Sequence, residues 1–187
     1  MTRRRGYVIG AALLLLSVVC RADEYSDTVT MFKNAGACSF IDNSYGYAVF
    51  PSIGKGGLVV GGAHGDGRVY KQGKYVGDTS MTQVEVGLLA GGEAFRQIIF
   101  FENQAAFDQF TSGNFEFGAG VSATVLQASA GASASTQGAS ADASSRKEAS
   151  TAGKYYKGMA VFTIVKGGAM AELSVAGQKY KFKPKGS

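Results

Sequence analysis

The chain has 187 residues, of which 19 are basic and 14 acidic, so its formal net charge is +5. Four arginines and no acidic residue lie within positions 1–22, so the other 165 residues carry 15 basic and 14 acidic side chains. Their net charge is only +1, so net charge gives no support for nucleic-acid binding.

Positions 1–22 have the pattern of a secretory signal peptide, in which a charged segment precedes a short apolar segment. Arginines at 3–5 are followed by an apolar run over 7–19, shorter than the roughly 20 residues of a transmembrane helix. Cys20 and Ala22 are small residues three and one positions before a cleavage site. We therefore expect residues 23–187 to be exported to the periplasm or the outer membrane. Lipidation of Cys20 is the alternative, which Val19 fits poorly, because Gly, Ala or Ser normally precedes such a cysteine.

Cleavage after Ala22 would leave Cys38 as the one cysteine of the mature chain. It cannot form an internal disulfide, and no CxxC pair is present for metal or redox chemistry. We interpret Cys38 as a small buried residue. A chain of this length suffices for one domain that buries roughly two thirds of its unfolded surface.

Residues 23–37 are predicted to form a helix, because Tyr25, Val29 and Phe32 share one helical face and Gly36 is a plausible stop. From position 47 the period changes to that of strands. Short apolar runs at 47–50, 57–63 and 68–70 are separated by glycines. The sequence predicts a hairpin turn at His64-Gly65-Asp66-Gly67 and a second turn at Gln72-Gly73.

Alternation over 81–89 predicts a strand with Val84, Val86 and Leu88 on one face and Gln83, Glu85 and Gly87 on the other. A strand over 93–101 ends in Ile-Ile-Phe-Phe, which is typical of burial on both faces.

Asn103 is a favourable N-cap, and Gly113 a favourable C′ residue, for a short helix whose apolar stripe is Ala106, Phe107 and Phe110. Residues 115–125 alternate without interruption and give the strongest strand signal in the chain.

Residues 127–152 are rich in Ala and Ser, and we interpret them as a mobile loop inside the domain. Three further strands are predicted at 159–165, 169–175 and 178–183. Glycine and alanine on strand faces allow sheets to curl tightly. The predicted fold is therefore mainly β with a few short helices (α+β), a compact single domain built on a strongly bent or barrel-like sheet.

Two short segments of the chain have similar sequences. Ala48-Val49-Phe50 precedes Lys55-Gly56-Gly57, and Ala160-Val161-Phe162 precedes Lys166-Gly167-Gly168 at nearly the same spacing. Two equivalent strand–turn–strand units would explain the similarity, and chance matching in a glycine-rich sequence would explain it equally well.

The glycine-rich stretch at 44–70 does not match a nucleotide-binding motif. A P-loop needs GxxxxGK followed by Ser or Thr, and Lys55 is followed by Gly56; the GxGxxG dinucleotide pattern also fails. His64 is the one histidine, no GxSxG elbow is present, and no carboxylate pair is singled out. We expect no enzyme activity, no nucleotide, no cofactor and no metal site.

The remaining candidate for a functional feature is the placement of the lysines. Lys179, Lys181 and Lys183 alternate with Tyr180 and Phe182, which predicts three ammonium groups on one strand face. Lys55 and Lys166 are expected in equivalent glycine turns, and Lys71 and Lys74 flank the Gln72-Gly73 turn. We hypothesise that these clusters contact anionic lipid headgroups. Alternatively, the lysines on the last strand protect a sheet edge from aggregation.

The segment GYAVFPSIGKGGLVVGGAHGDGRVY resembles the hallmark segment of the SYLF domain family. The similarity continues through MTQVEVGLLAGGEAFRQIIFFENQAAFDQF, GNFEFGAGVSATV and GMAVFTIVKGGAMAELSVAG, so it spans roughly residues 23–177. The resemblance implies non-enzymatic binding of lipid, since eukaryotic relatives bind phosphoinositides and some bind actin. It makes Lys55 the first candidate for headgroup contact.

Two features depart from the family pattern. The chain has QASAGASASTQG where many members have a Gly-Pro-x-Gly-Arg stretch, so an arginine that would meet phosphate is missing, and Lys33 is the one cation of the N-terminal helix. Because a bacterial envelope generally lacks phosphoinositides, the expected ligand is another anionic phospholipid, such as phosphatidylglycerol or cardiolipin. The alternatives are a structural or protein-interaction module of the envelope and a hydrolase that would require His64.

Overall fold

The computed structural model describes residues 20–57, 60–86, 93–118, 121–126, 154–166 and 173–186. Most of the expected signal peptide and the whole Ala/Ser-rich segment at 127–152 lie outside these residues. The helical elements are α1 (Cys20–Phe32), the wider helical turn η1 (Lys33–Ala37), α2 (Cys38–Asn43) and α3 (Gln104–Phe110). The strands are β1 (Gly46–Gly57), β2 (Val60–Lys71), β3 (Lys74–Val86), β4 (Glu93–Phe101), β5 (Asn114–Glu116), β6 (Ser122–Leu126), β7 (Met159–Lys166), β8 (Leu173–Ser174) and β9 (Lys179–Pro184).

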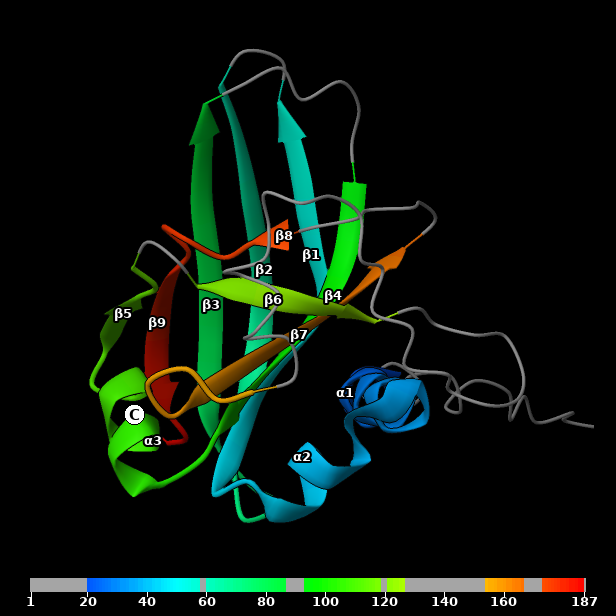
Figure 1. Ribbon diagram of the computed structural model, residues 1–187, viewed down its shortest axis with the longest axis vertical. Coiled ribbons are helices and arrows are strands. Elements are labelled where there is room, and N and C mark those ends of the chain that lie inside the picture. Colours follow the sequence, from blue (N-terminus) through cyan, green and yellow to red (C-terminus); the bar gives the residue numbers. More distant parts are fainter. Residues whose placement is uncertain are drawn as a thin grey trace, which may run out of the picture.

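The described strands form one sheet in the order β5-β9-β3-β2-β1-β4-β7-β6-β8, antiparallel except for the pair β6–β7. β5 and β6 lie toward opposite ends of this order, and only residues 117–121 join them. Five residues span at most about 18 Å, so the sheet must curl until its two ends approach each other. Figure 1 shows this curl, with β6 and β7 crossing in front of the long strands. The predicted mainly β, strongly bent single domain is confirmed.

The sheet has an apolar core on each face, because neighbouring residues of a strand point to opposite sides. On β4, Phe95, Ile99 and Phe101 belong to the inner core, whereas Ile98 and Phe100 belong to the outer core beneath the N-terminal helices. All five are at most 1% exposed, so the predicted burial of this strand on both faces is confirmed.

The inner core contains a hydrogen-bonded chain of polar side chains. Gln97 Nε2 donates to Gln178 Oε1 at 3.0 Å and to the Tyr180 hydroxyl at 2.8 Å. Gln178 Nε2 donates to Gln83 Oε1 at 3.1 Å, and Gln83 Nε2 donates to the carbonyl oxygen of Ala176. Burial raises the pKa of Tyr180, although the Gln97 hydrogen bond acts in the opposite direction. These hydrogen bonds link β3, β4 and β9 across the inside of the curled sheet. They favour one register of the three strands relative to one another.

The predicted turn at 64–67 is wrong, because His64-Gly65-Asp66-Gly67 lies in the middle of the continuous strand β2. The two glycines serve close packing. A Cβ at Gly65 would come within 2.6 Å of Ile53 Cγ1, and a Cβ at Gly67 within 2.6 Å of Phe50 Cδ1. Neither has a positive φ.

Other local predictions are confirmed. Gln72 and Gly73 have φ values of 48° and 75° and form the turn between β2 and β3. The Asn103 side chain caps α3 by accepting from the Ala106 N–H at 3.0 Å. Gly113 has the positive φ of 121° expected after the helix, but it lies two positions after the C-cap residue Thr111, one beyond the predicted C′ position. Val29 and Phe32 of α1 pack on the outer face of the sheet, as their spacing predicts.

The single strand predicted over 115–125 is wrong. β5 ends at Glu116 and pairs with β9, whereas β6 begins at Ser122 and pairs with β7 and β8. The alternation is present in both pieces, but the chain uses residues 117–121 to cross between the two ends of the curled sheet. The strand predicted at 169–175 is β8, which is described only over Leu173–Ser174.

The two similar segments, 48–57 and 160–168, begin in β1 and β7, the two strands that flank β4. Their registers against β4 differ by one residue. Ala48 of β1 and Val161 of β7 are both paired with Ile99. Consequently Ala48 and Phe50 face the inner core, while Ala160 and Phe162 face the outer core. A one-residue shift exchanges the two faces of a strand, so the two segments are not a structural repeat.

Cys38 is exposed at the start of α2, so the expectation of a buried cysteine is wrong. The preceding Ala37 is the buried residue of this turn, whereas Cys38 faces solvent. Its Sγ donates to the Lys33 carbonyl oxygen at 3.1 Å. The expected cleavage after Ala22 falls inside α1 and stays a prediction.

Candidate functional site

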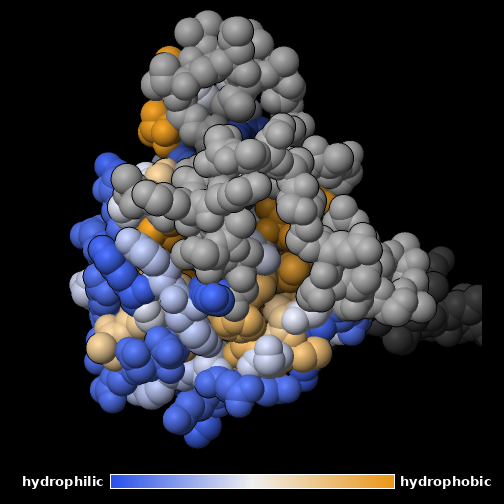
Figure 2. Space-filling view, viewed as in Figure 1, coloured by the Kyte–Doolittle hydropathy of each residue, from blue (hydrophilic) through white to orange (hydrophobic). Residues whose placement is uncertain are grey.

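Three of the predicted lysines form a row on one exposed side of β9. Lys179, Lys181 and Lys183 are exposed, while Tyr180 between them is 1% exposed and faces the inner core. The strand therefore separates ammonium groups from aromatic rings, as its alternation predicts. Figure 2 shows hydrophilic side chains along the side of the molecule that β5 and β9 form.

The neighbouring strands extend this row into a polar surface, which we call the lysine face. Its residues on β9, β3 and β2 form three cross-strand rows: Lys179 with Thr82 and His64, Lys181 with Ser80 and Asp66, and Lys183 with Asp78 and Arg68. Residues directly opposite each other on paired strands point to the same side of a sheet. Glu116 of β5 is paired with Lys179, so the lysine face together with this edge carries four permanent cations and three carboxylates, and three of the cations come from the single strand β9.

The ion pairs of the lysine face are long, and their carboxylates are exposed to solvent. Arg68 Nε lies 3.9 Å from Asp78 Oδ1, and Lys179 Nζ lies 3.7 Å from Glu116 Oε2 on β5. Exposed ion pairs of this kind contribute about 0–1 kcal/mol. These ion pairs therefore hold Arg68 and Lys179 only weakly.

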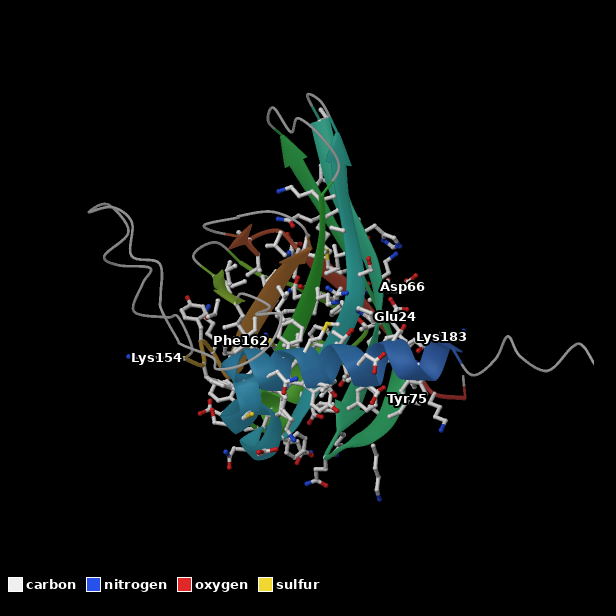
Figure 3. The ribbon with its side chains drawn as sticks, turned by 90° about the vertical axis from the view of Figure 1, so that its right-hand side faces the viewer. Glu24, Asp66, Tyr75, Lys154, Phe162 and Lys183 are labelled. Carbon is white, nitrogen blue, oxygen red and sulfur yellow. The ribbon has the colours of Figure 1, made fainter. Side chains whose placement is uncertain are left out.

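Arg68 connects the lysine face to α1. Its guanidinium carbon lies 4.3 Å from the ring centre of Tyr25 on α1 and 5.1 Å from that of Tyr75 on β3. The Tyr75 hydroxyl donates to Asp78 Oδ1 at 2.8 Å. Burial raises the pKa of Tyr25, and the Arg68 charge partly opposes that rise. Figure 3 places Tyr75, Asp66 and Lys183 around the N-terminal end of α1.

Lys71 and Lys74 lie at the other end of β2 and β3, beside the connecting turn. Lys71 Nζ lies 5.1 Å from the ring centre of Tyr45 and 5.6 Å from that of Phe107. Its hydrogen bond with the Tyr45 side chain raises the pKa of Lys71. Lys74 is exposed. The structure therefore separates these two lysines from Lys55 and Lys166.

Lys55 and Lys166 are strand residues, so the expectation that they occupy glycine turns is wrong. Lys55 lies within β1 opposite Glu93, and Lys166 ends β7 opposite Ala94. Both therefore flank the start of β4, where they are paired with adjacent residues of that strand. Lys55 is half-buried.

A small cavity of about 110 Å³ lies between β5 and the turn that precedes β7. Phe117, Val121 and Met159 form its apolar floor, and Glu116 and Lys157 contribute polar groups to its lining. Among the described residues, no group of three His, Cys, Asp or Glu side chains is arranged to hold a metal ion. Within the same residues, no helix has the length and apolar character to cross a membrane.

Sequence reasoning missed the β2 and β3 contribution to the lysine face. His64, Asp66 and Arg68 are spaced two residues apart, the pattern of one strand face, but the intervening glycines made the segment read as a turn. The alternation of polar residues with Gly65 and Gly67 was the available signal.

The described residues thus form a curled sheet with α1 and α2 over an apolar part of its outer face and a row of lysines on β9. Residues 82–185, more than half of the chain, match the family Ysc84, described as a Las17-binding protein actin regulator. The chain is also 30% identical over 143 residues to beta cell expansion factor A of Aeromonas veronii. That match covers 74% of this chain and 46% of the relative, so the chain spans about half the relative's length.

The chain therefore belongs to the Ysc84 (SYLF) domain family, as its sequence motifs indicate. This is a family of binding domains. Its members are associated with lipid and with protein binding.

Proposed function

We propose that this protein is a non-enzymatic module that binds anionic phospholipid headgroups at a membrane surface of the bacterial cell envelope. The observation that carries the proposal is the lysine face, on which Lys179, Lys181 and Lys183 project from one strand without intervening acidic residues on that strand. Family membership supports a binding role without assigning the ligand. Export to the periplasm or the outer membrane is part of the proposal.

The physical basis is electrostatic attraction to a charged surface. A lysine near an anionic membrane contributes about 1 kcal/mol, and the contribution falls off within a Debye length, so three lysines together contribute at most about 3 kcal/mol. Since 1.4 kcal/mol corresponds to a tenfold change in affinity, loss of all three lowers affinity by at most about a hundredfold. The attraction weakens as salt screens it.

The test is co-sedimentation of the purified protein with vesicles of phosphatidylcholine alone and of phosphatidylcholine with phosphatidylglycerol. We expect binding only to the anionic vesicles, and less of it at higher salt. Replacing Lys179, Lys181 and Lys183 together by serine should nearly abolish binding. The matched control replaces Lys33, Lys154 and Lys157, which are also exposed, and removes the same charge elsewhere. Equal loss in both variants would show an effect of net charge and contradict the site.

The other predicted headgroup residues are tested separately. Lys55→Ser, Lys166→Ser and Lys71→Ser each remove one cation from another part of the sheet. A larger loss in Lys55→Ser than in Lys181→Ser would move the binding site to the start of β4.

Protein binding is the second candidate function, and the family's description as a Las17-binding actin regulator favours it. Absence of vesicle binding at low salt, together with a protein partner captured by the unsubstituted chain and lost in the three-lysine variant, would replace lipid by protein as the ligand of the lysine face.

A further inference from the structure

Two exposed valines lie at the end of β2 and β3 that is remote from their connecting turn. Val60 is 64% exposed and Val84 is 73% exposed. Among the described residues, Met31 of α1 is the other large hydrophobic side chain that is exposed, at 39%. Figure 1 shows that β1, β2 and β3 project past the crossing strands at this end, and Figure 2 shows hydrophobic atoms there.

The strand register places the valines on the same side of the sheet as the lysine face. Val84 is paired with Gly62, two residues along each strand from the pair Thr82–His64. Thr82 is in turn paired with Lys179. Val84 and Lys179 are therefore diagonal neighbours, a relation that separates residues by about 7–8 Å. One continuous face thus has an apolar end and a cationic body.

The positions of β2 and β1 that lie beside Val84 on the same side of the sheet are glycines. Gly62 opposite Val84 has no side chain, and a Cβ added at Gly54 or Gly56 of the adjacent β1 would meet nothing within 4 Å. In the sequence, the connection between β1 and β2 is Leu58-Val59, and positions 87–92 between β3 and β4 carry no polar side chain.

The chemistry of this end favours a bilayer over a protein partner. Two valines present far less area than the roughly 800 Å² per partner of a stable protein interface. A bilayer needs no such area, because the burial of a small apolar surface and the electrostatic attraction of basic side chains to anionic lipids add together. Aliphatic side chains next to lysines match the boundary between acyl chains and anionic headgroups.

We propose that Val60 and Val84 insert at the boundary between acyl chains and headgroups of an anionic bilayer, with Lys179 at headgroup level. This inference rests on the proposed lipid-binding function and adds the orientation of the protein on the membrane: the strand ends enter, and Lys181 and Lys183 lie progressively farther along the same face. Gly57 ends β1 with a φ of 148°, and a Cβ at this position would clash with the Gly61 backbone. The backbones of β1 and β2 therefore lie close together at the end that inserts.

The chain contains no tryptophan, so one introduced residue reports its own environment. In Val84→Trp, we expect the emission to shift to shorter wavelength on binding to phosphatidylcholine–phosphatidylglycerol vesicles. Lipids brominated near the headgroup end of the acyl chain should quench it. Met31→Trp is the matched control, because Met31 is exposed on α1, and its emission should not change.

The affinity of serine variants provides a second measurement. Because Val60 and Val84 are exposed, their replacement by serine should leave the circular dichroism spectrum and melting temperature unchanged. The double variant should bind anionic vesicles about tenfold more weakly, whereas Met31→Ser should bind as the unsubstituted protein does.

The outcomes separate this inference from the function on which it rests. Vesicle binding with unchanged Val84→Trp emission, or with an unaffected valine double variant, overturns insertion and leaves headgroup binding intact. A shift in Met31→Trp but not in Val84→Trp assigns the membrane contact to α1 and also overturns it. Failure of the unsubstituted protein to bind anionic vesicles overturns both.

Discussion

Gly67 lies in the middle of β2, directly beside the ring of Phe50. A Cβ at this position would come within 2.6 Å of Phe50 Cδ1 and 2.8 Å of the Val49 carbonyl oxygen. Contacts this short require the ring or the strand to move. The glycine therefore gives a large aromatic side chain its place in the inner core, where Phe50 is fully buried.

Replacing Gly67 by alanine should lower the free energy of unfolding by about 1–3 kcal/mol, the usual cost of overpacking a core. Gly54→Ala is the matched control on the adjacent β1. A Cβ there meets nothing within 4 Å, and a surface change of this kind stays within about 0.5 kcal/mol. Urea unfolding followed by circular dichroism measures both. Equal stability of the two variants would contradict the packing role of Gly67.

The same residue shows why part of the fold was not predictable from local sequence. Asp-Gly flanked by glycine favours a turn, and nothing nearby in the sequence distinguishes a glycine that supplies positive φ from one that makes room for a ring. The distinction depends on Phe50, which is 17 positions away and reaches Gly67 only once β1 and β2 pair. By contrast, the Gln72-Gly73 turn and the Asn103 cap depend on neighbouring residues and were predicted.

At the scale of elements, α1 is attached to the sheet in two ways. Its C-terminal part buries Phe32 completely in the outer core, while its N-terminal part contacts β2 through Tyr25 and Arg68. A cation over an aromatic ring contributes about 0.5–1 kcal/mol when exposed. The N-terminal part is therefore held much more weakly than the C-terminal part.

Replacing Arg68 by alanine should loosen the first turns of α1 while leaving the sheet unchanged. We expect amide hydrogen exchange in residues 24–29 to accelerate about two- to fivefold, which is the effect of losing 0.5–1 kcal/mol. Lys183→Ala is the control, since it removes a cation from the same face. Similar exchange in the two variants would show that Arg68 does not hold α1.

The presence of most strands could be predicted from the sequence, but the partner of each strand in the sheet could not. The strands over 93–101, 159–165 and 178–183 have periods that local burial dictates, and all three were found. The alternation over 115–125 was equally regular, yet it became two strands with different partners, because closing the curled sheet required a crossing near Gly118. For the lysine face, the β9 row follows from alternation, whereas its neighbours on β2 and β3 follow only from register.

The whole molecule is one sheet with two cores of different origin. The inner core is enclosed by the curl of the sheet and by α3, whereas the outer core exists only because α1 and α2 cover the strands β1, β4 and β7. Phe40 of α2 lies 4.8 Å from Phe162 and 5.6 Å from Phe100, measured between ring centres. Without the helices, the sheet would present a broad apolar surface to water.

A chain that begins at Ser44 should therefore lose its stable monomeric fold. Val49, Ile98, Phe100, Phe162 and Ile164 are each at most 4% exposed in the outer core. Full burial of such side chains contributes about 1.5–3 kcal/mol each, so even partial exposure of all five costs about 5 kcal/mol or more. That loss is comparable with the 5–15 kcal/mol stability of a whole domain.

We expect the shortened chain to bind the dye 8-anilinonaphthalene-1-sulfonate, to sediment as aggregates and to unfold in urea without a cooperative transition. The control is a chain that begins at residue 23, which retains α1 and α2 and should unfold cooperatively. Cooperative unfolding of the shortened chain at an unchanged urea midpoint would mean that the inner core alone sustains the sheet. In that case the helices would be free to leave the sheet, and the orientation proposed for the membrane-bound protein would have to include the outer face they cover.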